Sequence, residues 1–301
     1  MNERGRLLVS GASGFLGAHV VETASRAGWQ VIALVHSAPL PLPLPAGARV
    51  LAADLSGAHE LERIFDSAAP LAVIHTAALS RIADCERDPR LAQIVNVEAA
   101  GELARHCAAR GARFVHVSTD LVFGAAPAPS AGFDEDSEPA PLSRYGVSKF
   151  EAESAVRSSE ARALVVRLPL LVGPSHGRGL GASDSIHAAL ARGEIPALFE
   201  DEWRTPLDVR SAAQALIELA GQASSGILHV AGPERISRYE LGLRALRQQG
   251  LRADRARARI RATTRHMAGL EKVRPADVSL NSARARSFLR TVLVGLDSGA
   301  S

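Results

Sequence analysis

One tyrosine and one lysine, four residues apart, are the side chains of this sequence best suited to acid–base chemistry. The chain has only two tyrosines and two lysines, and Tyr145 stands four positions before Lys149. On a helix, residues four apart lie on the same face. An ammonium beside a phenol stabilises the phenolate and lowers the tyrosine pKa, so Tyr145 is a candidate general acid or base. The pair alone is also typical of a helix whose tyrosine packs and whose lysine is solvated.

A glycine-rich turn near the N-terminus predicts a phosphate site. It follows an apolar run at residues 7–9 and precedes a helical pattern, with glycines one residue off the GxGxxG spacing. Glycines let backbone N–H groups approach a pyrophosphate, and the start of the helix favours its negative charge. This context predicts a dinucleotide site, with a plain tight turn as the alternative. The predicted cofactor contacts here are Gly11, Ser13, Gly14, Phe15, Leu16 and Gly17.

Strand-like and helix-like segments alternate along the first three quarters of the chain. This βαβ rhythm is typical of a parallel sheet with helices on both faces. The sequence therefore predicts an α/β fold with a doubly wound parallel sheet, that is, a Rossmann fold. The runs that predict strands are residues 7–9, 29–35, 50–53, 71–74, 113–117, 163–168 and 227–231.

Polar residues at the strand ends are placed to contact a ligand, because open parallel sheets bind ligands at the carboxyl ends of their strands. After the second strand the chain has His36 and no carboxylate. An NAD site would place Asp or Glu there, so the sequence favours NADP and leaves NAD open. Ser118 and Thr119 follow the fifth strand and could donate to a substrate oxygen. Asn96, in a predicted helix among apolar neighbours, is either a satisfied core group or part of a site.

Composition describes an ordinary globular chain and excludes several classes of protein. Its 301 residues are 47% hydrophobic and 22% charged, with a net charge of +3. That charge is too small to indicate nucleic-acid binding, and no apolar run is long enough to span a membrane. The two cysteines have no metal-ligand or disulfide spacing, and the ten histidines form no cluster. We therefore expect no metal site and a cytoplasmic location.

The chain changes character after the sixth predicted strand. Glycines at positions 173, 177, 179 and 181 predict a mobile loop over the ligand cleft. We expect an NAD(P)-binding Rossmann domain at residues 1–168 and 205–232. A smaller, mostly helical substrate-binding domain is expected at residues 169–204 and 233–301.

In this order, the motifs resemble those of the extended short-chain dehydrogenase/reductase family. More narrowly, they resemble dTDP-4-dehydrorhamnose reductases and their relatives. The resemblance covers nearly the whole chain and implies an NAD(P)-dependent oxidoreductase. The matching residues are the glycine turn, Asp54, Leu55, Ala77, Ala78, the string 118–124, Tyr145, Lys149, Arg274-Pro275 and Leu280-Asn281.

The resemblance assigns roles to single residues. Thr119 is similar to the hydroxyl residue that polarises the substrate carbonyl, and Tyr145 to the proton donor. Lys149 is similar to the residue that binds the nicotinamide ribose and lowers the tyrosine pKa. Asp54 and Leu55 resemble residues that meet the adenine. The remaining cofactor contacts that we expect are His36, Ala77, Ala78, Leu79 and Leu168.

On the substrate side, we expect Asp120 and Leu170 beside the sugar. Arg204 and Arg274 are predicted phosphate contacts because a guanidinium fork suits a phosphate, with salt bridges inside the protein as an equally good alternative. Rhamnose-type reductases commonly carry an aromatic residue after the sixth strand, whereas residues 167–170 here are Arg-Leu-Pro-Leu. This departure puts dTDP-rhamnose chemistry in doubt and leaves related nucleotide-sugars open.

These residues predict NAD(P)H-dependent reduction of a ketone, most of all a 4-keto nucleotide-sugar, with the proton from Tyr145. A sugar-nucleotide epimerase of the same family is one alternative. Another is an NADP-binding regulatory subunit without turnover. The string at 167–170 also resembles the regulatory beta subunit of methionine adenosyltransferase. The expected partner is the small-molecule substrate, and a homodimer is left open.

Overall fold

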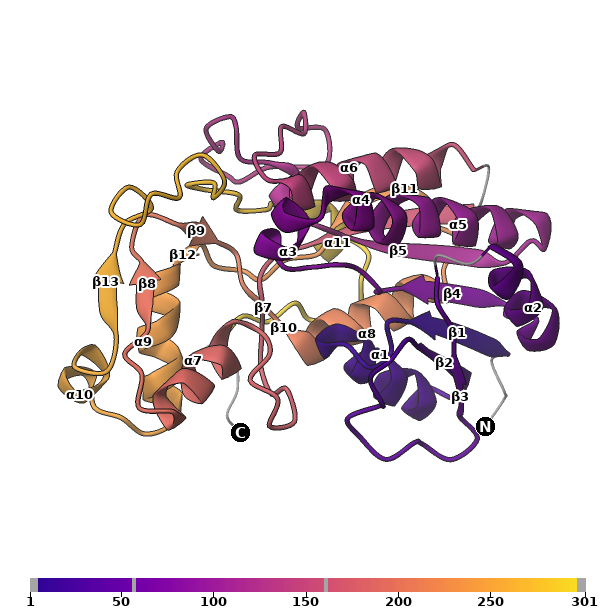
Figure 1. The fold of residues 1–301 in the computed structure, drawn as a ribbon, viewed down its shortest axis with the longest axis horizontal. Helices are drawn as coiled ribbons and strands as arrows, with labels where there is room; N and C mark the ends of the chain where they lie inside the picture. Colours follow the sequence, from indigo (N-terminus) through magenta and orange to yellow (C-terminus); the bar gives the residue numbers. More distant parts are fainter. Residues whose placement is uncertain (1–4, 56–57, 160–161, 297–301) are drawn as a thin grey trace.

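One parallel sheet forms the centre of the molecule (Figure 1). The computed structural model describes residues 5–55, 58–159 and 162–296. Within them the strands of the sheet lie in the order β11-β6-β5-β4-β1-β2-β3, and every neighbouring pair is parallel. These strands are β1 (Arg6–Ser10), β2 (Gln30–Val35), β3 (Arg49–Ala52), β4 (Ala72–His75), β5 (Arg113–Thr119), β6 (Arg162–Leu168) and β11 (Gly226–His229).

Each face of the sheet contributes to a separate hydrophobic core. In β1, Leu7 packs into one core and Leu8 into the other, and both are fully buried. Burial on both faces explains why the inner strands β1, β2, β4, β5 and β6 are continuous apolar runs in the sequence. The predicted doubly wound α/β fold is confirmed. One face is covered by α1 (Phe15–Arg26) and α8 (Val209–Ala220), and the other by α2 (Ala58–Ala68), α5 (Ala99–Ala109) and α6 (Arg144–Arg157).

The strand order reverses between β1 and β4. Connections on the two sides of this point lead away from each other, so a crevice opens at the carboxyl ends of these two strands. Dinucleotides bind at such a switch point in doubly wound sheets. The topology therefore directs attention to the segments that leave β1 and β4.

The segment that leaves β4 contains an uncommon helical turn. After α3 (Ile82–Arg87), the chain runs through α4 (Pro89–Ala92), a π-helical turn η1 (Gln93–Glu98) and α5 as one continuous helical stretch. The sequence predicts this helix but not the π turn. Such turns are rare and are frequently found at functional sites. Asn96 lies within η1.

Much of the chain between β6 and α8, and between β11 and α11, forms a smaller part with its own core, on the left of Figure 1. Its helices are α7 (Ala182–Ala191), α9 (Arg238–Gln248) and α10 (Ala253–Arg257), while α11 (Ala283–Arg286) lies near β11. The sequence predicts a mostly helical part, but its described residues also form three short strand pairs, too short to leave an apolar pattern. They are β7 (Leu171–Val172) with β10 (Leu207–Asp208), β8 (Ala197–Phe199) with β13 (Arg261–Thr263), and β9 (Trp203–Arg204) with β12 (Ile236–Ser237).

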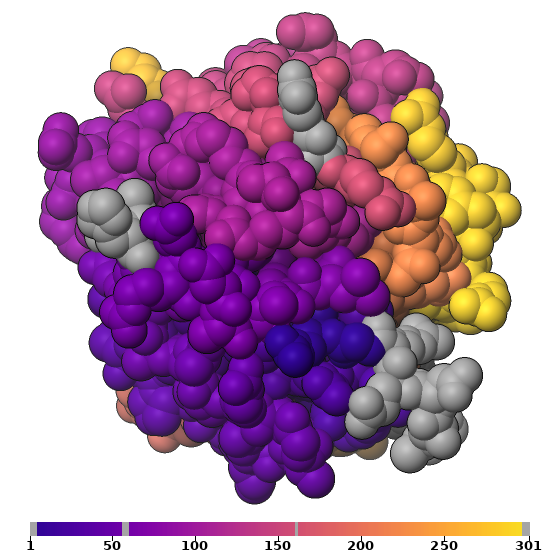
Figure 2. Space-filling model, turned by 90° about the vertical axis from the view of Figure 1, so that its right-hand side faces the viewer, coloured from indigo at the N-terminus to yellow at the C-terminus, as the bar shows by residue number. Residues whose placement is uncertain are grey.

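Figure 2 looks at the side of the molecule away from this smaller part. Indigo, magenta and orange segments lie next to one another there, although they come from distant parts of the chain. This arrangement follows from the strand order, which places β6 and β11 beyond β5 and leaves β3 at the opposite edge. Residues far apart in sequence therefore share one sheet and one set of strand ends.

Candidate active site

A cavity of about 620 Å³ opens at the carboxyl ends of β1, β2, β4 and β5. Its volume is in the range of sites that hold small organic ligands. Thr119, Tyr145 and Lys149, the three predicted catalytic residues, all line it. So do all the residues predicted to contact the cofactor, namely Gly11, Ser13, Gly14, Phe15, Leu16, Gly17, His36, Asp54, Leu55, Ala77, Ala78, Leu79 and Leu168.

Close backbone contacts explain the glycines of the turn. Gly11 has a φ of +68°, and a Cβ on it would lie 2.6 Å from the backbone nitrogen of Ala77. A Cβ on Gly17 would lie 2.1 Å from the carbonyl oxygen of Gly11. Gly14 precedes α1 with no side-chain cap, and the first turn has no acidic residue. The N–H groups of this helix start therefore suit an anion such as the diphosphate of a dinucleotide.

Tyr145 lies in the first turn of α6. Ser143 caps this helix, because its hydroxyl accepts a hydrogen bond from Gly146 N at 3.1 Å. A Cβ on Gly146 would lie 2.2 Å from the carbonyl oxygen of Leu121, so the helix start packs tightly on the segment after β5. The hydroxyl of Thr119 lies near the Tyr145 phenol and acts to lower its pKa. The fold thus brings together the two residues expected to contact a substrate carbonyl.

The pKa of Tyr145 is raised, and the lowering expected from the sequence is wrong. Burial is the main cause of the rise, and the nearby Asp120 and Cys85 act in the same direction. The nearby hydroxyl of Thr119 opposes the rise but does not reverse it. Lys149, on the same face of the helix, does not compensate for these effects. The phenol is therefore protonated at neutral pH, as a proton donor must be.

The ammonium of Lys149 contacts a histidine. Lys149 is buried, and its Nζ lies 3.2 Å from Nε2 of His116 in β5. Burial lowers the pKa of Lys149 to about 8, against the opposing effect of Glu153 one turn further along α6. Burial, together with the charge of Lys149, also lowers the His116 pKa well below its ordinary value. The imidazole is therefore neutral, and its Nε2 can accept a hydrogen bond from the ammonium.

A second buried histidine extends this contact across the sheet. In the strand register Ser10 lies beside His75, and His75 beside His116. The two imidazole rings stack with their centroids 5.3 Å apart, and Ser10 Oγ lies 2.6 Å from His75 Nδ1. Burial lowers the pKa of His75 to about 3. Sequence reasoning missed both histidines as site residues, although each lies near the carboxyl end of a predicted strand.

Thr119 is held by its immediate neighbours at the start of η2 (Asp120–Val122). Its hydroxyl accepts a hydrogen bond from Leu121 N at 3.2 Å and donates one to Oδ1 of Asp120 at 3.1 Å. Burial raises the pKa of Asp120 to about 6, with Arg204 opposing. Oδ2 of Asp120 lies 3.4 Å from Nε of Arg204, but it accepts no hydrogen bond within the described ranges. Asp120 thus connects Thr119 to an arginine of the smaller part.

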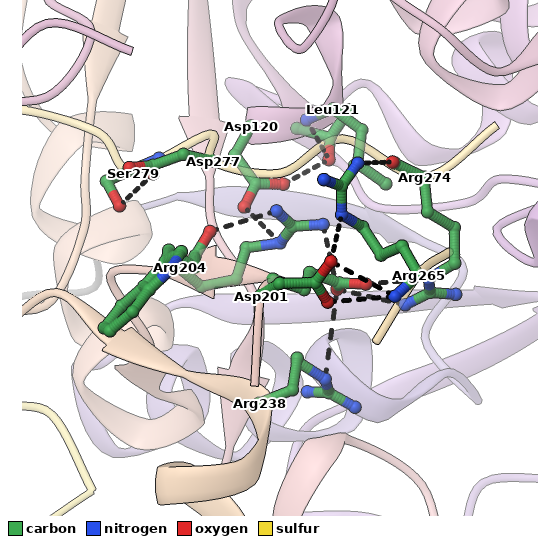
Figure 3. A network of polar contacts seen from close by, with 12 residues as sticks. Asp120, Leu121, Asp201, Arg204, Arg238, Arg265, Arg274, Asp277 and Ser279 are labelled. Atoms are coloured by element: carbon green, nitrogen blue, oxygen red, sulfur yellow. Dashed lines mark hydrogen bonds and ion pairs between the residues drawn. The ribbon is translucent and has the colours of Figure 1, made fainter. Parts of the chain in front are cut away.

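Arg204 and Arg274 both contact a buried carboxylate in the network drawn in Figure 3. Arg274 donates to Glu202 through Nε at 2.7 Å and Nη2 at 3.0 Å, and Arg204 Nη2 lies 3.1 Å from the same carboxylate. Nε of Arg238 is 4.0 Å away. Burial alone would raise the pKa of Glu202, but the three arginines lower it. Arg204 and Arg274 therefore form salt bridges inside the protein, which was the alternative to their predicted role as phosphate contacts.

None of the four predicted substrate residues, Asp120, Leu170, Arg204 and Arg274, is among the residues that line the cavity, and two further differences concern this region. Leu170 packs against the core of the smaller part, and its neighbours Pro169 and Leu171 line the cavity in its place. Glu202 was not singled out from the sequence. Only its burial, at 1% exposure, distinguishes it from the exposed Glu200 nearby, and burial of a single carboxylate leaves no local sequence pattern.

Asn96 joins two walls of the cavity. Its side-chain oxygen accepts a hydrogen bond from Leu79 N at 2.7 Å, and its amide donates to Leu79 O at 3.1 Å. The same amide donates to Ser148 Oγ at 2.9 Å. Leu79 lines the cavity, and Ser148 precedes Lys149 in α6. Asn96 is therefore a satisfied buried group that also positions the site.

The described residues lack two features, a membrane-spanning helix and a cluster of metal ligands. No helix there is long and apolar enough to cross a membrane. The same residues contain no group of three or more His, Cys, Asp or Glu side chains that could hold a metal ion.

Three relatives resemble this chain over about three quarters of its length. The probable low-salt glycan biosynthesis reductase Agl14 of Haloferax volcanii is 32% identical over 236 residues, which cover 78% of this chain and 77% of that protein. The dTDP-4-dehydrorhamnose reductase of Mycobacterium tuberculosis is 33% identical, covering 78% and 72%. Methionine adenosyltransferase 2 subunit beta of Xenopus tropicalis is 30% identical, covering 78% and 70%.

Solved structures share the fold. The dTDP-4-dehydrorhamnose reductase of Bacillus anthracis, in complex with NADP, has a TM-score of 0.81 with this chain at 21% identity. The match covers 98% of this chain and 96% of that one. In sequence, residues 5–294 match the family model for the RmlD substrate binding domain. Since that match spans nearly the whole described chain, and with it the glycine turn and the Tyr145/Lys149 pair, this protein belongs to the RmlD substrate binding domain family.

Proposed function

We propose that this protein uses NADPH to reduce a ketone on a nucleotide-sugar. The leading candidate for the substrate is a 4-keto nucleotide-sugar. The observation that carries the proposal is that Thr119, Tyr145 and Lys149 line the same cavity as the glycine turn. Membership of the family and the relatives described as reductases support it. Bound NADPH would supply the hydride, and the protein would supply position and a proton.

In this proposal the side chains around the cavity divide the work. Tyr145 gives its proton to the carbonyl oxygen, because its raised pKa keeps the phenol protonated at neutral pH. The Thr119 hydroxyl turns from Asp120 to the same oxygen as a second donor. Lys149, largely protonated below its pKa of about 8, places a positive charge beside the forming alkoxide.

NADP is the proposed cofactor, with NAD second. The chain leaves β2 at His36 without a carboxylate, so nothing at that position repels a 2′-phosphate. An acidic residue from another segment does lie near His36. Oδ2 of Asp54, in the segment after β3, is 3.9 Å from Nε2 of His36. The NADP complex of the Bacillus anthracis reductase supports the same choice.

The substrate phosphates are proposed to bind at the arginine cluster beside Asp120. Arg204, Arg238 and Arg274 carry three positive charges, and Glu202 and Asp120 carry two negative ones, which leaves one positive charge in excess. Nη1 of Arg238 is buried and has no hydrogen-bond partner in the described part of the chain. An excess cation with a free donor suits the diphosphate of a nucleotide-sugar.

Loss of NADPH absorbance with a panel of 4-keto nucleotide-sugars and small ketones tests the proposal. Tyr145→Phe should lower kcat about 10²- to 10⁴-fold, because it removes the proton donor, while NADPH affinity stays nearly constant. Tyr239→Phe is the matched control, since the only other tyrosine packs against the core of the smaller part. Tight NADPH binding without turnover of any substrate would contradict a reductase.

A second candidate is an NADP-binding subunit of a larger enzyme. The 30% identity with methionine adenosyltransferase 2 subunit beta favours it. Recovery of a stable stoichiometric enzyme partner, together with no turnover by the chain alone, would support this candidate, whereas robust turnover would exclude it. An epimerase would instead retain its nicotinamide through purification. The cytoplasmic location and the homodimer stay predictions.

A further inference from the structure

The loop between β7 and α7, residues 173–181, lies against the start of α1. The carbonyl oxygen of Pro174 is 2.8 Å from Nε2 of His19 in α1. At the other side, Ser175 donates to Asp184 of α7 through its backbone nitrogen at 2.7 Å and its hydroxyl at 2.6 Å. The segment predicted as a loop over the cleft is therefore attached to both helices.

Arg178 extends from this loop to the glycine turn. Its Nη1 donates to Ser13 O at 2.5 Å, its Nη2 to Gly14 O at 3.4 Å, and its Nε to Ser175 O at 3.1 Å. A guanidinium has five N–H donors, so these bonds leave two donors uncommitted. All three acceptors are backbone carbonyls.

The charge of Arg178 has no acidic counterpart in the described chain. Burial lowers its pKa, and no carboxylate among those residues forms an ion pair with it. The start of α1 beside it carries the positive end of the helix dipole and no acidic residue in its first turn. The carbonyl oxygens of Ser13, Gly14 and Ser175 offset part of this charge, and an anion on the turn would offset more of it. A diphosphate on the turn is the anion that the surrounding N–H groups suit.

We propose that Arg178 is a cofactor-binding residue, supplied by the smaller part of the molecule, that binds the diphosphate of the dinucleotide. The inference rests on the proposed nucleotide-dependent function and adds a residue from outside the sheet. Since residues 173–181 connect β7 with α7, a dinucleotide bound in this way joins the two parts of the molecule. Loss of Arg178 therefore weakens ligands that contain a diphosphate.

Calorimetric titration of the full chain with ADP, NADP⁺ and adenosine 2′-phosphate tests this role. Arg178→Gln should weaken ADP and NADP⁺ about 10- to 50-fold, because charge-assisted hydrogen bonds are lost. Adenosine 2′-phosphate has no diphosphate and should change less than about twofold. Arg178→Lys keeps the charge and should lose only part of the affinity. Arg192→Gln is the matched control, since this exposed arginine pairs with Glu194 just after α7.

Salt distinguishes binding from a merely structural contact. Added salt should narrow the gap in ADP affinity between the wild type and Arg178→Gln, because screening weakens the lost charge interaction. Equal weakening of all three ligands, a gap that salt does not change, or unaltered affinities would each overturn the inference. Arg178→Lys provides the comparison where Arg178→Gln does not fold, as judged by circular dichroism. A wild type that binds none of the ligands would overturn the dinucleotide site itself.

Discussion

Burial sets the protonation of the groups that surround the candidate catalytic site. It raises the pKa of Tyr145, raises that of Asp120 to about 6 and lowers that of Lys149 to about 8. Each shift favours the neutral form, as expected for titratable groups taken out of water. Neighbouring charges and hydrogen bonds modify these shifts without reversing them. At this scale, the charge of each residue depends on its surroundings more than on its type.

Absorbance titration can measure the Tyr145 pKa directly, because the chain has only two tyrosines. In a Tyr239→Phe protein the phenolate signal should appear above the ordinary tyrosine pKa of 10.0. Adding Asp120→Asn removes a charge that disfavours the phenolate, so the midpoint should fall by about one pH unit. Asp136→Asn, at an exposed position, is the control. A midpoint below 10 in the folded parent would refute the raised pKa.

Burial of the charged Lys149 side chain should lower the free energy of unfolding at neutral pH. Its pKa is about 8 in the folded chain against an ordinary 10.5, so the folded state binds this proton less tightly than the unfolded state. The loss in the free energy of unfolding is therefore fully present below about pH 8, and it disappears as the pH rises to about 10.5. Lys149→Met should raise the free energy of unfolding at about pH 7 by roughly 1–3 kcal/mol and have little effect near pH 10.

Urea unfolding at both pH values checks this sign. Lys272→Met is the matched control, because the other lysine is exposed and should leave the free energy of unfolding unchanged. A Lys149→Met protein that is less stable than the wild type by the same amount at both pH values would disprove the expected cost. Such a result would mean that the contact with His116 outweighs desolvation.

Two helical elements determine where the catalytic residues lie. α6 begins at a Ser143 cap, and its glycine at position 146 allows close packing on the segment after β5. η1 carries Asn96, which hydrogen-bonds to Leu79 in one wall and to Ser148 in the other. The two elements thus hold Lys149 and the end of β4 at a fixed separation.

Asn96→Ala should therefore affect both stability and function. It leaves the N–H of Leu79 without its partner and the C=O with only the weaker bond from Cys85 Sγ, so the free energy of unfolding should fall by about 1–3 kcal/mol. NADPH affinity should fall as well, because Leu79 lines the cavity. Gln93→Ala, an exposed position of the same turn, is the control. Equal denaturation midpoints for the two variants would argue against this role of η1.

Across the whole molecule, a charged cluster connects the sheet to the smaller part. Asp120 follows β5, while Glu202, Arg204 and Arg238 belong to the smaller part, and Arg274 comes from near the C-terminal end (Figure 3). Buried ion pairs of this kind contribute little net stability when intact, but loss of one partner leaves charges without compensation. The cluster should therefore be sensitive to a single change.

Glu202→Gln should destabilise the protein by about 3–5 kcal/mol, because three arginines lose their shared carboxylate. Since the arginines lower the Glu202 pKa, its contribution is present above the ordinary glutamate pKa and is lost as pH falls through the folded pKa. The difference between the variant and the wild type should therefore shrink in acid. Glu200→Gln, at an exposed position nearby, is the control for chemical denaturation at each pH. A difference that stays constant in acid would be evidence against this ion-pair network.

The fold could be predicted because its signals are local. Continuous apolar runs marked all seven strands of the sheet, and the inner strands β1, β2, β4, β5 and β6 are buried on both faces. The turn at residues 11–17 was recognisable because only glycine fits its contacts with Ala77 and with its own carbonyl. Residues after the strands were assigned to one site because parallel strands place their carboxyl ends at one edge. The short strand pairs of the smaller part had no such signal.

The sequence by itself determined the class of fold, the strand ends that line the cavity and the residues that could do the chemistry, because these depend on local pattern and on the rules of parallel sheets. Only the tertiary structure decided protonation and partners. The raised pKa of Tyr145 depends on burial, and Lys149 contacts His116, 33 positions away. Arg274 reaches Glu202 across 72 positions, and Arg178 reaches Ser13 across 165. No local pattern encodes contacts over such separations.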